Sequence, residues 1–145
     1  MSDDRIESET LIEAPVERVW SLVAEPGFWV LPEESLTGAV AKAGDSTVAK
    51  NPEHGEFPVR VEKVEPPTYV AYRWASAFPG QELTEDNSTL VEFTLTAEGD
   101  KTRLRVVESG FAALTVPGEA RDQALKNNTT GWVQVLGSAK KRSEA

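Results

Sequence analysis

The C-terminal segment, residues 119–141, constrains the fold of this sequence most, because it has the spacing of one long amphipathic helix. At about 3.6 residues per turn, one side of that helix carries a mostly apolar stripe. The stripe comprises Leu125, Asn128, Thr129, Trp132, Val135, Leu136 and Ala139. A stripe of this length needs a large covering surface, which only the preceding strands can supply. Because Asn128 and Thr129 are polar and lie beside Trp132, we expect the helix to roof a cavity rather than a solid core.

Segments in which apolar and polar residues alternate precede the helix, and each is typical of a half-buried strand. We expect strands at residues 5–13, 36–42, 46–50, 57–65, 68–76, 88–97 and 102–109. Short turns join most of them, which predicts an antiparallel sheet. The apolar phase of the fourth segment slips by one position at Val64, so we expect a β-bulge near Glu62 and Lys63.

A second, shorter helix is expected at residues 16–24, where apolar residues recur with helical spacing. The connector that follows is bounded by Pro26 and Pro32 and contains Phe28 and Trp29. Two large rings in so short a connector are expected to plug an edge of the core.

The composition limits the class of protein. A chain of 145 residues suits one domain, so we assign residues 1–145 to a single domain. A formal net charge of −9 argues against nucleic acid and anionic membrane surfaces as partners. With no cysteine and a single histidine, His54, the sequence favours neither a thiolate nucleophile nor a zinc or multi-histidine site. We expect no cofactor and no metal.

The N-terminal ten residues are acidic and polar, unlike a secretory signal peptide. In addition, no apolar run approaches the roughly 20 residues that a membrane-spanning helix needs. These features predict no membrane insertion and a cytoplasmic location.

Five short runs occur in order along nearly the whole chain. They are APVERVW at 14–20, VEPP at 64–67 leading to YRW at 72–74, STLVEFTL at 88–95, ESGF at 108–111 and GW at 131–132. Together they resemble the AHSA1-like (activator of Hsp90 ATPase homologue-like) branch of the START/SRPBCC superfamily. The resemblance implies an α+β helix-grip fold (Bet v 1/START-like), with a seven-stranded antiparallel sheet wrapped around the long C-terminal helix and a hydrophobic tunnel between them. It carries over no catalytic residue, because the family has no shared catalytic set.

We expect the tunnel to be lined from both layers, by inward residues of the strands and by the inward stripe of the C-terminal helix. The candidate ligand-cavity residues are Trp20, Phe28, Trp29, Val61, Tyr72, Trp74, Val91, Phe93, Leu104, Glu108, Asn128 and Trp132. The competing interpretation is that the tryptophans are plain core and that Asn128 is a satisfied buried amide.

Two of the polar or small residues leave alternatives open. The strand phase points Glu108 inward, where an ionised carboxylate needs a partner or a raised pKa, but we favour a position at the strand end in contact with water. Gly131 falls in mid-helix, where we favour close packing of helix on sheet over the approach of a ligand to the backbone.

Three functions from different classes fit these observations. The preferred one is non-catalytic binding of a small hydrophobic, ring-bearing molecule, such as a polyketide, flavonoid or lipid-like compound, with Asn128 and Glu108 orienting a ligand hydroxyl. The second is an enzyme of the polyketide cyclase or hydratase type, with Glu108 and Tyr72 as acid–base groups. The third is a protein-interaction domain like the Hsp90 activators, which would need a basic patch on the chaperone. A weak homodimer is a further expectation.

The Trp132→Ala substitution should lower the free energy of unfolding by about 3 to 5 kcal/mol, because the hole left by a large buried ring cannot fully collapse. The shift of the urea midpoint measures this cost. A loss below about 1 kcal/mol would mean that Trp132 is exposed and that the predicted helix phase is wrong.

Overall fold

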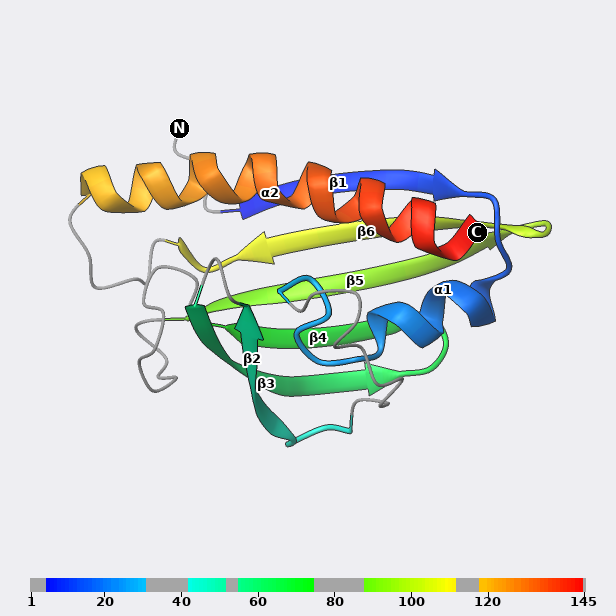
Figure 1. Cartoon of the computed structure of the whole chain (residues 1–145), viewed down its shortest axis with the longest axis horizontal. Helices are drawn as coiled ribbons and strands as arrows, with labels where there is room; N and C mark the ends of the chain where they lie inside the picture. The colour runs from blue at the N-terminus through cyan, green and yellow to red at the C-terminus, as the bar shows by residue number, and fades with distance from the viewer. Residues whose placement is uncertain (1–4, 31–41, 52–54, 75–87, 112–117, 145) are drawn as a thin grey trace.

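A six-stranded antiparallel sheet and a long C-terminal helix make up most of the described chain in this computed structural model (Figure 1). The described residues are 5–30, 42–51, 55–74, 88–111 and 118–144. The elements in chain order are β1 (Arg5–Ile12), α1 (Val16–Val23), β2 (Ser46–Asn51), β3 (Gly55–Glu65), β4 (Tyr69–Trp74), β5 (Thr89–Glu98), β6 (Lys101–Ser109) and α2 (Gly118–Glu144).

The strands lie in the order β1-β6-β5-β4-β3-β2, and every neighbouring pair is antiparallel. Strands β2 to β6 are therefore neighbours in chain order, the arrangement expected when consecutive strands pair antiparallel. Strand β1 adds to the far edge of the sheet, beside β6. The helix-grip architecture is confirmed, with six described strands where seven were expected. The seventh expected strand, residues 36–42, lies outside the described residues.

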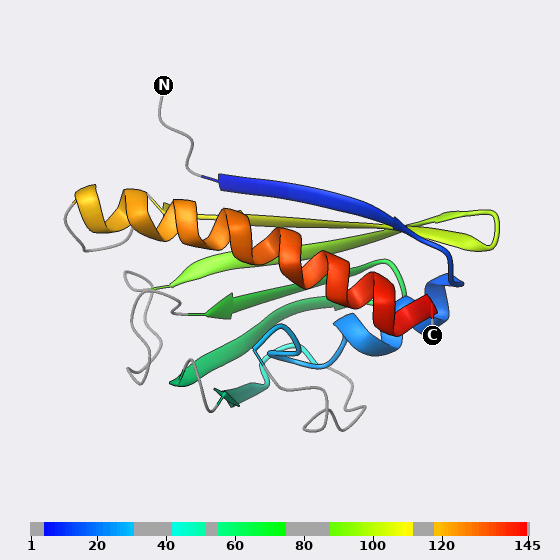
Figure 2. The ribbon, with the colours of Figure 1, turned by 45° about the horizontal axis from the view of Figure 1, so that its top comes forward.

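Helix α2 crosses one face of the sheet obliquely, beginning near the β1 edge and ending beside α1 (Figure 2). Trp132, Leu136 and Ala139 are all buried, which confirms the predicted phase of the inward stripe. The prediction is wrong for Thr129, which is exposed. Its hydroxyl donates to the carbonyl of Leu125 one turn earlier, at 2.7 Å, so this polar group is satisfied within the helix itself.

The last turn of α2 extends beyond the predicted end and is anchored to the end of β1. The Glu144 carboxylate accepts a hydrogen bond from the backbone N–H of Glu13 at 2.9 Å and pairs with Lys140 one turn back. The Lys140 ammonium also donates to the carbonyl of Leu11 at 3.1 Å. Among the described elements, no helix is long and apolar enough to cross a membrane.

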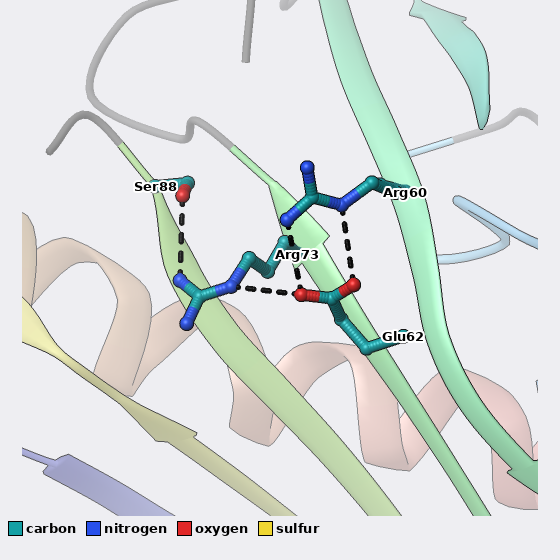
Figure 3. A network of polar contacts seen from close by, with 4 residues as sticks. All are labelled: Arg60, Glu62, Arg73 and Ser88. Atoms are coloured by element: carbon teal, nitrogen blue, oxygen red, sulfur yellow. Dashed lines mark hydrogen bonds and ion pairs between the residues drawn. The ribbon is translucent and has the colours of Figure 1, made fainter. Parts of the chain in front are cut away.

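A β-bulge interrupts β3 where the sequence predicted it. The pairing with β4 shifts between Val61 and Lys63, so Glu62 is the extra residue. Figure 3 shows the Glu62 carboxylate accepting hydrogen bonds from Arg60 and Arg73, and Arg73 donating in turn to the Ser88 hydroxyl. The bond from Arg60, and then the charges of both arginines, hold the pKa of Glu62 below its usual value.

The connector after α1 approaches β2 closely enough to require a glycine. Gly27 has a φ of +77°, and a Cβ at this position would lie 2.7 Å from the Cβ of Ala49 on β2. A second contact is made at Val30, three residues after Gly27 in the connector. The side-chain amide of Asn51, on β2, donates to the Val30 carbonyl at 2.7 Å. These two contacts fix the connector that carries Phe28 and Trp29 against the sheet.

Gly27→Ala should lower the free energy of unfolding by about 2 kcal/mol or more, because it adds a steric clash with Ala49 to the cost of a positive φ. Gly44→Ala is the matched control, since Gly44 also has a positive φ of +92° but a Cβ there meets no atom of the described chain within 4 Å. Urea unfolding of both variants separates the two costs. Equal losses would contradict the close approach of the connector to β2.

Candidate ligand-binding site

Glu108 is fully buried beneath α2, with 0% of its surface exposed. The expectation that it reaches water is therefore wrong. The sheet continues beyond it on both sides, because Glu108 pairs with Ile6 on β1 and with Val91 on β5. The alternation of β6, which also buries Leu104 and Val106, turns this carboxylate inward.

Four neutral donors hold the Glu108 carboxylate, two on each oxygen. Oε2 accepts from the sheet side, from Trp74 Nε1 at 2.8 Å and Thr89 Oγ1 at 2.5 Å. Oε1 accepts from α2, from Asn128 Nδ2 at 3.0 Å and Trp132 Nε1 at 2.7 Å. Trp74 and Thr89 are paired across β4 and β5, and the two helical donors are one turn apart. One side chain thus bonds the helix to the sheet.

Burial raises the pKa of Glu108, because an ionised carboxylate loses its hydration there. The bonds from Thr89, Trp132, Trp74 and Asn128 act in the opposite direction, but none of these donors carries a charge. Asn128 is half-buried, and its amide N–H donates to the carboxylate with which it was expected to orient a ligand.

A cavity of about 630 Å³ lies between α2 and the connector that follows α1. The strands contribute Phe57 and Trp74 to its wall. Its lining residues are Leu22, Phe28, Trp29, Val30, Phe57, Trp74, Asn127, Asn128, Gly131, Trp132, Gln134, Val135, Ser138, Ala139 and Arg142. The wall is thus mostly apolar and aromatic, with polar side chains from α2.

The structure brings five of the twelve candidate residues to this cavity and places seven elsewhere. Those on the wall are Phe28, Trp29, Trp74, Asn128 and Trp132. Those in the core and off the wall are Trp20, Val61, Tyr72, Val91, Phe93, Leu104 and Glu108. The aromatic rings of the sheet and of α2 do come together, but they pack mainly against one another and do not enclose a single open space.

Trp29 is the reason for this difference. Its ring lies 5.2 Å from Tyr72, 5.7 Å from Phe93 and 5.7 Å from Trp132, measured between centroids, and so contacts both layers. The connector therefore inserts a ring into the space that the sequence assigned to a ligand, instead of plugging an edge of the core. Within the described part of the chain, the buried Nε1 of Trp29 has no hydrogen-bond acceptor.

The acid–base pair expected for a cyclase does not meet at the cavity. The Tyr72 hydroxyl donates to the carbonyl of Val23 at 2.5 Å, away from Glu108. Burial, and then the charge of Glu25, raises the pKa of Tyr72 above its ordinary value. Within the described ranges, no group of three or more histidines or carboxylates is placed to hold a metal ion.

Most of the wall residues that the sequence analysis missed continue the inward stripe of α2 towards its C-terminus. Val135 and Ala139 belong to the predicted stripe but were not assigned to the cavity, whereas Ser138 and Arg142 follow Val135 at helical spacing, so extending the stripe would have identified them. Gly131 itself corrects a prediction: a Cβ there meets no atom of the described residues within 4 Å, so this glycine lies at the cavity and is not a site of close packing against the described sheet.

Comparison with known proteins places this geometry among related folds. The family profile described as "Activator of Hsp90 ATPase homolog 1-like protein" matches residues 13–142. A comparison with curated proteins finds no match.

Three solved structures illustrate the structural similarity. DynU16, from the dynemicin biosynthetic locus, is 24% identical with a TM-score of 0.71 over 97% of this chain and 47% of its own. A crystal structure from Mesorhizobium loti is 20% identical with a TM-score of 0.71 over 94% of each chain. The solution structure of the Aha1 dimer from Colwellia psychrerythraea is 17% identical with a TM-score of 0.71 over 97% of this chain and 96% of its own. At these identities the similarity shows the fold alone, and the chain spans about half the length of DynU16.

Glu108→Gln should lower the free energy of unfolding by about 1 to 3 kcal/mol. A glutamine side chain offers one oxygen and one NH₂ group, so its nitrogen faces the indole N–H of either Trp74 or Trp132, and neither indole can accept a hydrogen bond. One buried donor then loses its acceptor. Urea unfolding at neutral pH measures the loss.

Glu92→Gln is the control for the same change of atoms. The Glu92 carboxylate accepts from the Tyr69 hydroxyl at 2.5 Å, and the oxygen of a glutamine can keep that bond. We expect this control to cost less than about 1 kcal/mol. A loss for Glu108→Gln no larger than the control's would mean that the four-donor arrangement contributes little to stability.

Proposed function

The chain belongs to the family of activator of Hsp90 ATPase homolog 1-like proteins, and we propose that it binds a small hydrophobic, ring-bearing molecule without changing it. The observation that carries this proposal is the cavity of about 630 Å³ beside α2. Its volume falls in the range of roughly 300 to 1,000 Å³ that is usual for small-molecule sites. Five of its described lining residues are aromatic: Phe28, Trp29, Phe57, Trp74 and Trp132.

The chemistry of the wall favours flat, apolar ligands such as polyketides, flavonoids or other lipid-like compounds. Aromatic walls gain from burying a ring and from offset or edge-to-face contacts with it. Burial contributes about 25 cal/mol per Å² of apolar surface, offset by the cost of immobilising the ligand, so we expect micromolar affinity. DynU16, which belongs to a biosynthetic locus, supports a small molecule as the ligand.

The raised pKa of Glu108 is the one observation that favours the cyclase or hydratase alternative. We prefer binding, because all four hydrogen bonds of this carboxylate go to Trp74, Thr89, Asn128 and Trp132, and because Glu108 does not line the cavity. The mass of the recovered ligand separates the two functions, since an enzyme would release a product of altered structure.

Protein partners are proposals of a different class. The Colwellia psychrerythraea relative is a dimer, which supports a weak homodimer for this chain. Sedimentation at increasing protein concentration tests it, and an unchanged monomer would oppose it. An Hsp90-type chaperone partner is supported by the family description alone. A cytoplasmic location fits both proposals.

Gly131→Leu should abolish ligand binding without lowering stability. Gly131 lines the cavity and a Cβ there meets no described atom within 4 Å, so a leucine side chain can occupy the ligand's space. Replacing a helical glycine also removes a cost of up to about 1 kcal/mol in helix propensity. The measurements are titration with the neutral fluorescent probe N-phenylnaphthylamine and with naringenin, a flavonoid, followed by mass spectrometry of the recovered naringenin.

Gly137→Leu is the matched control, because Gly137 lies on the same helix, is exposed and is off the cavity wall. It should bind both molecules as the unsubstituted protein does. Binding that survives Gly131→Leu, or no saturable signal from the unsubstituted protein, would overturn the proposal. Naringenin of altered mass would replace it with the enzyme alternative.

A further inference from the structure

Polar and charged side chains are distributed unevenly along the cavity wall. Its polar side chains all come from α2, and among the fifteen described lining residues Arg142 is the single charged one. Asn127 and Arg142, the most distant lining residues on α2, are fifteen positions apart, or about 22 Å at the helical rise. The wall therefore has amide groups near one end and a guanidinium group at the other.

The charge of Arg142 is not neutralised by the described part of the chain, in which it forms no ion pair. The carboxylate of Glu144, two residues on, is engaged by Lys140 and by the backbone N–H of Glu13. Arg142 is only partly exposed and belongs to the last turn of α2, where the helix dipole favours a cation.

From this placement we propose that the ligand is an elongated aromatic acid whose carboxylate pairs with Arg142 while its rings occupy the aromatic part of the cavity. The inference rests on the proposed binding function and specifies the class of ligand. A guanidinium presents paired N–H donors that match the two oxygens of a carboxylate. The contact is also less screened beside an apolar wall than in open solvent.

The net charge of the protein makes this one cation decisive. At −9, the chain as a whole repels anions, so an apolar cavity in it without a local positive charge would favour neutral ligands over acids. Arg142 reverses that preference at the end of the cavity where it lies.

Two fluorescent probes with one ring system test the proposal. Anilinonaphthalene sulfonate carries an anionic group, and N-phenylnaphthylamine has the same rings without it. Arg142→Gln should weaken the sulfonate by about tenfold and the neutral probe by less than about twofold, as expected for loss of one charge-assisted contact. Arg142→Lys, which keeps the charge, should weaken the sulfonate less than Arg142→Gln does.

Lys141→Gln is the matched control for net charge, because Lys141 is the neighbouring residue, is exposed and is off the wall. It should change both affinities by less than about twofold, since a solvated charge is well screened. If Arg142→Gln weakens both probes equally, weakens neither, or matches Lys141→Gln, the inference is overturned while the binding function stands. If neither probe binds the unsubstituted protein, the binding function fails and the inference fails with it.

Discussion

The arrangement of α2 on the sheet depends on one buried carboxylate. Glu108 receives two hydrogen bonds from the sheet and two from the helix, so the helix has a defined rotation and a defined position along the strands. Apolar packing alone tolerates small slips of a helix, but four directional bonds to two oxygen atoms do not. Removing any one donor leaves a buried acceptor less satisfied, whereas the apolar contacts around it could readjust.

The same bonds determine the character of the cavity. Trp74 and Trp132 direct their indole N–H groups at Glu108, so it is their rings that are left to contact the cavity. A polar network behind the wall therefore orients an apolar surface in front of it. This division explains how a fully buried carboxylate stands close to a hydrophobic site without lining it.

The connector after α1 sets where the open space begins. Gly27 and the bond from Asn51 to Val30 hold this connector on the sheet, and Trp29 then projects between the layers. The inner volume under α2 is filled by that ring. The cavity therefore lies beside the C-terminal half of α2, where small residues such as Gly131 and Ser138 leave space.

The sequence by itself determined the elements and their inward faces. Alternation located the described strands and the bulge at Glu62, and the 3.6-residue period gave the buried phase of α2 through Trp132, because these patterns depend on local backbone geometry. Only the tertiary structure decided which inward residues face a ligand and which face one another. Trp29 lies in a short connector that has neither helical nor strand periodicity to indicate where its ring points. Glu108 is buried because β1 and β5 flank the end of its strand. Such contacts join residues far apart in the chain, and no local pattern encodes them.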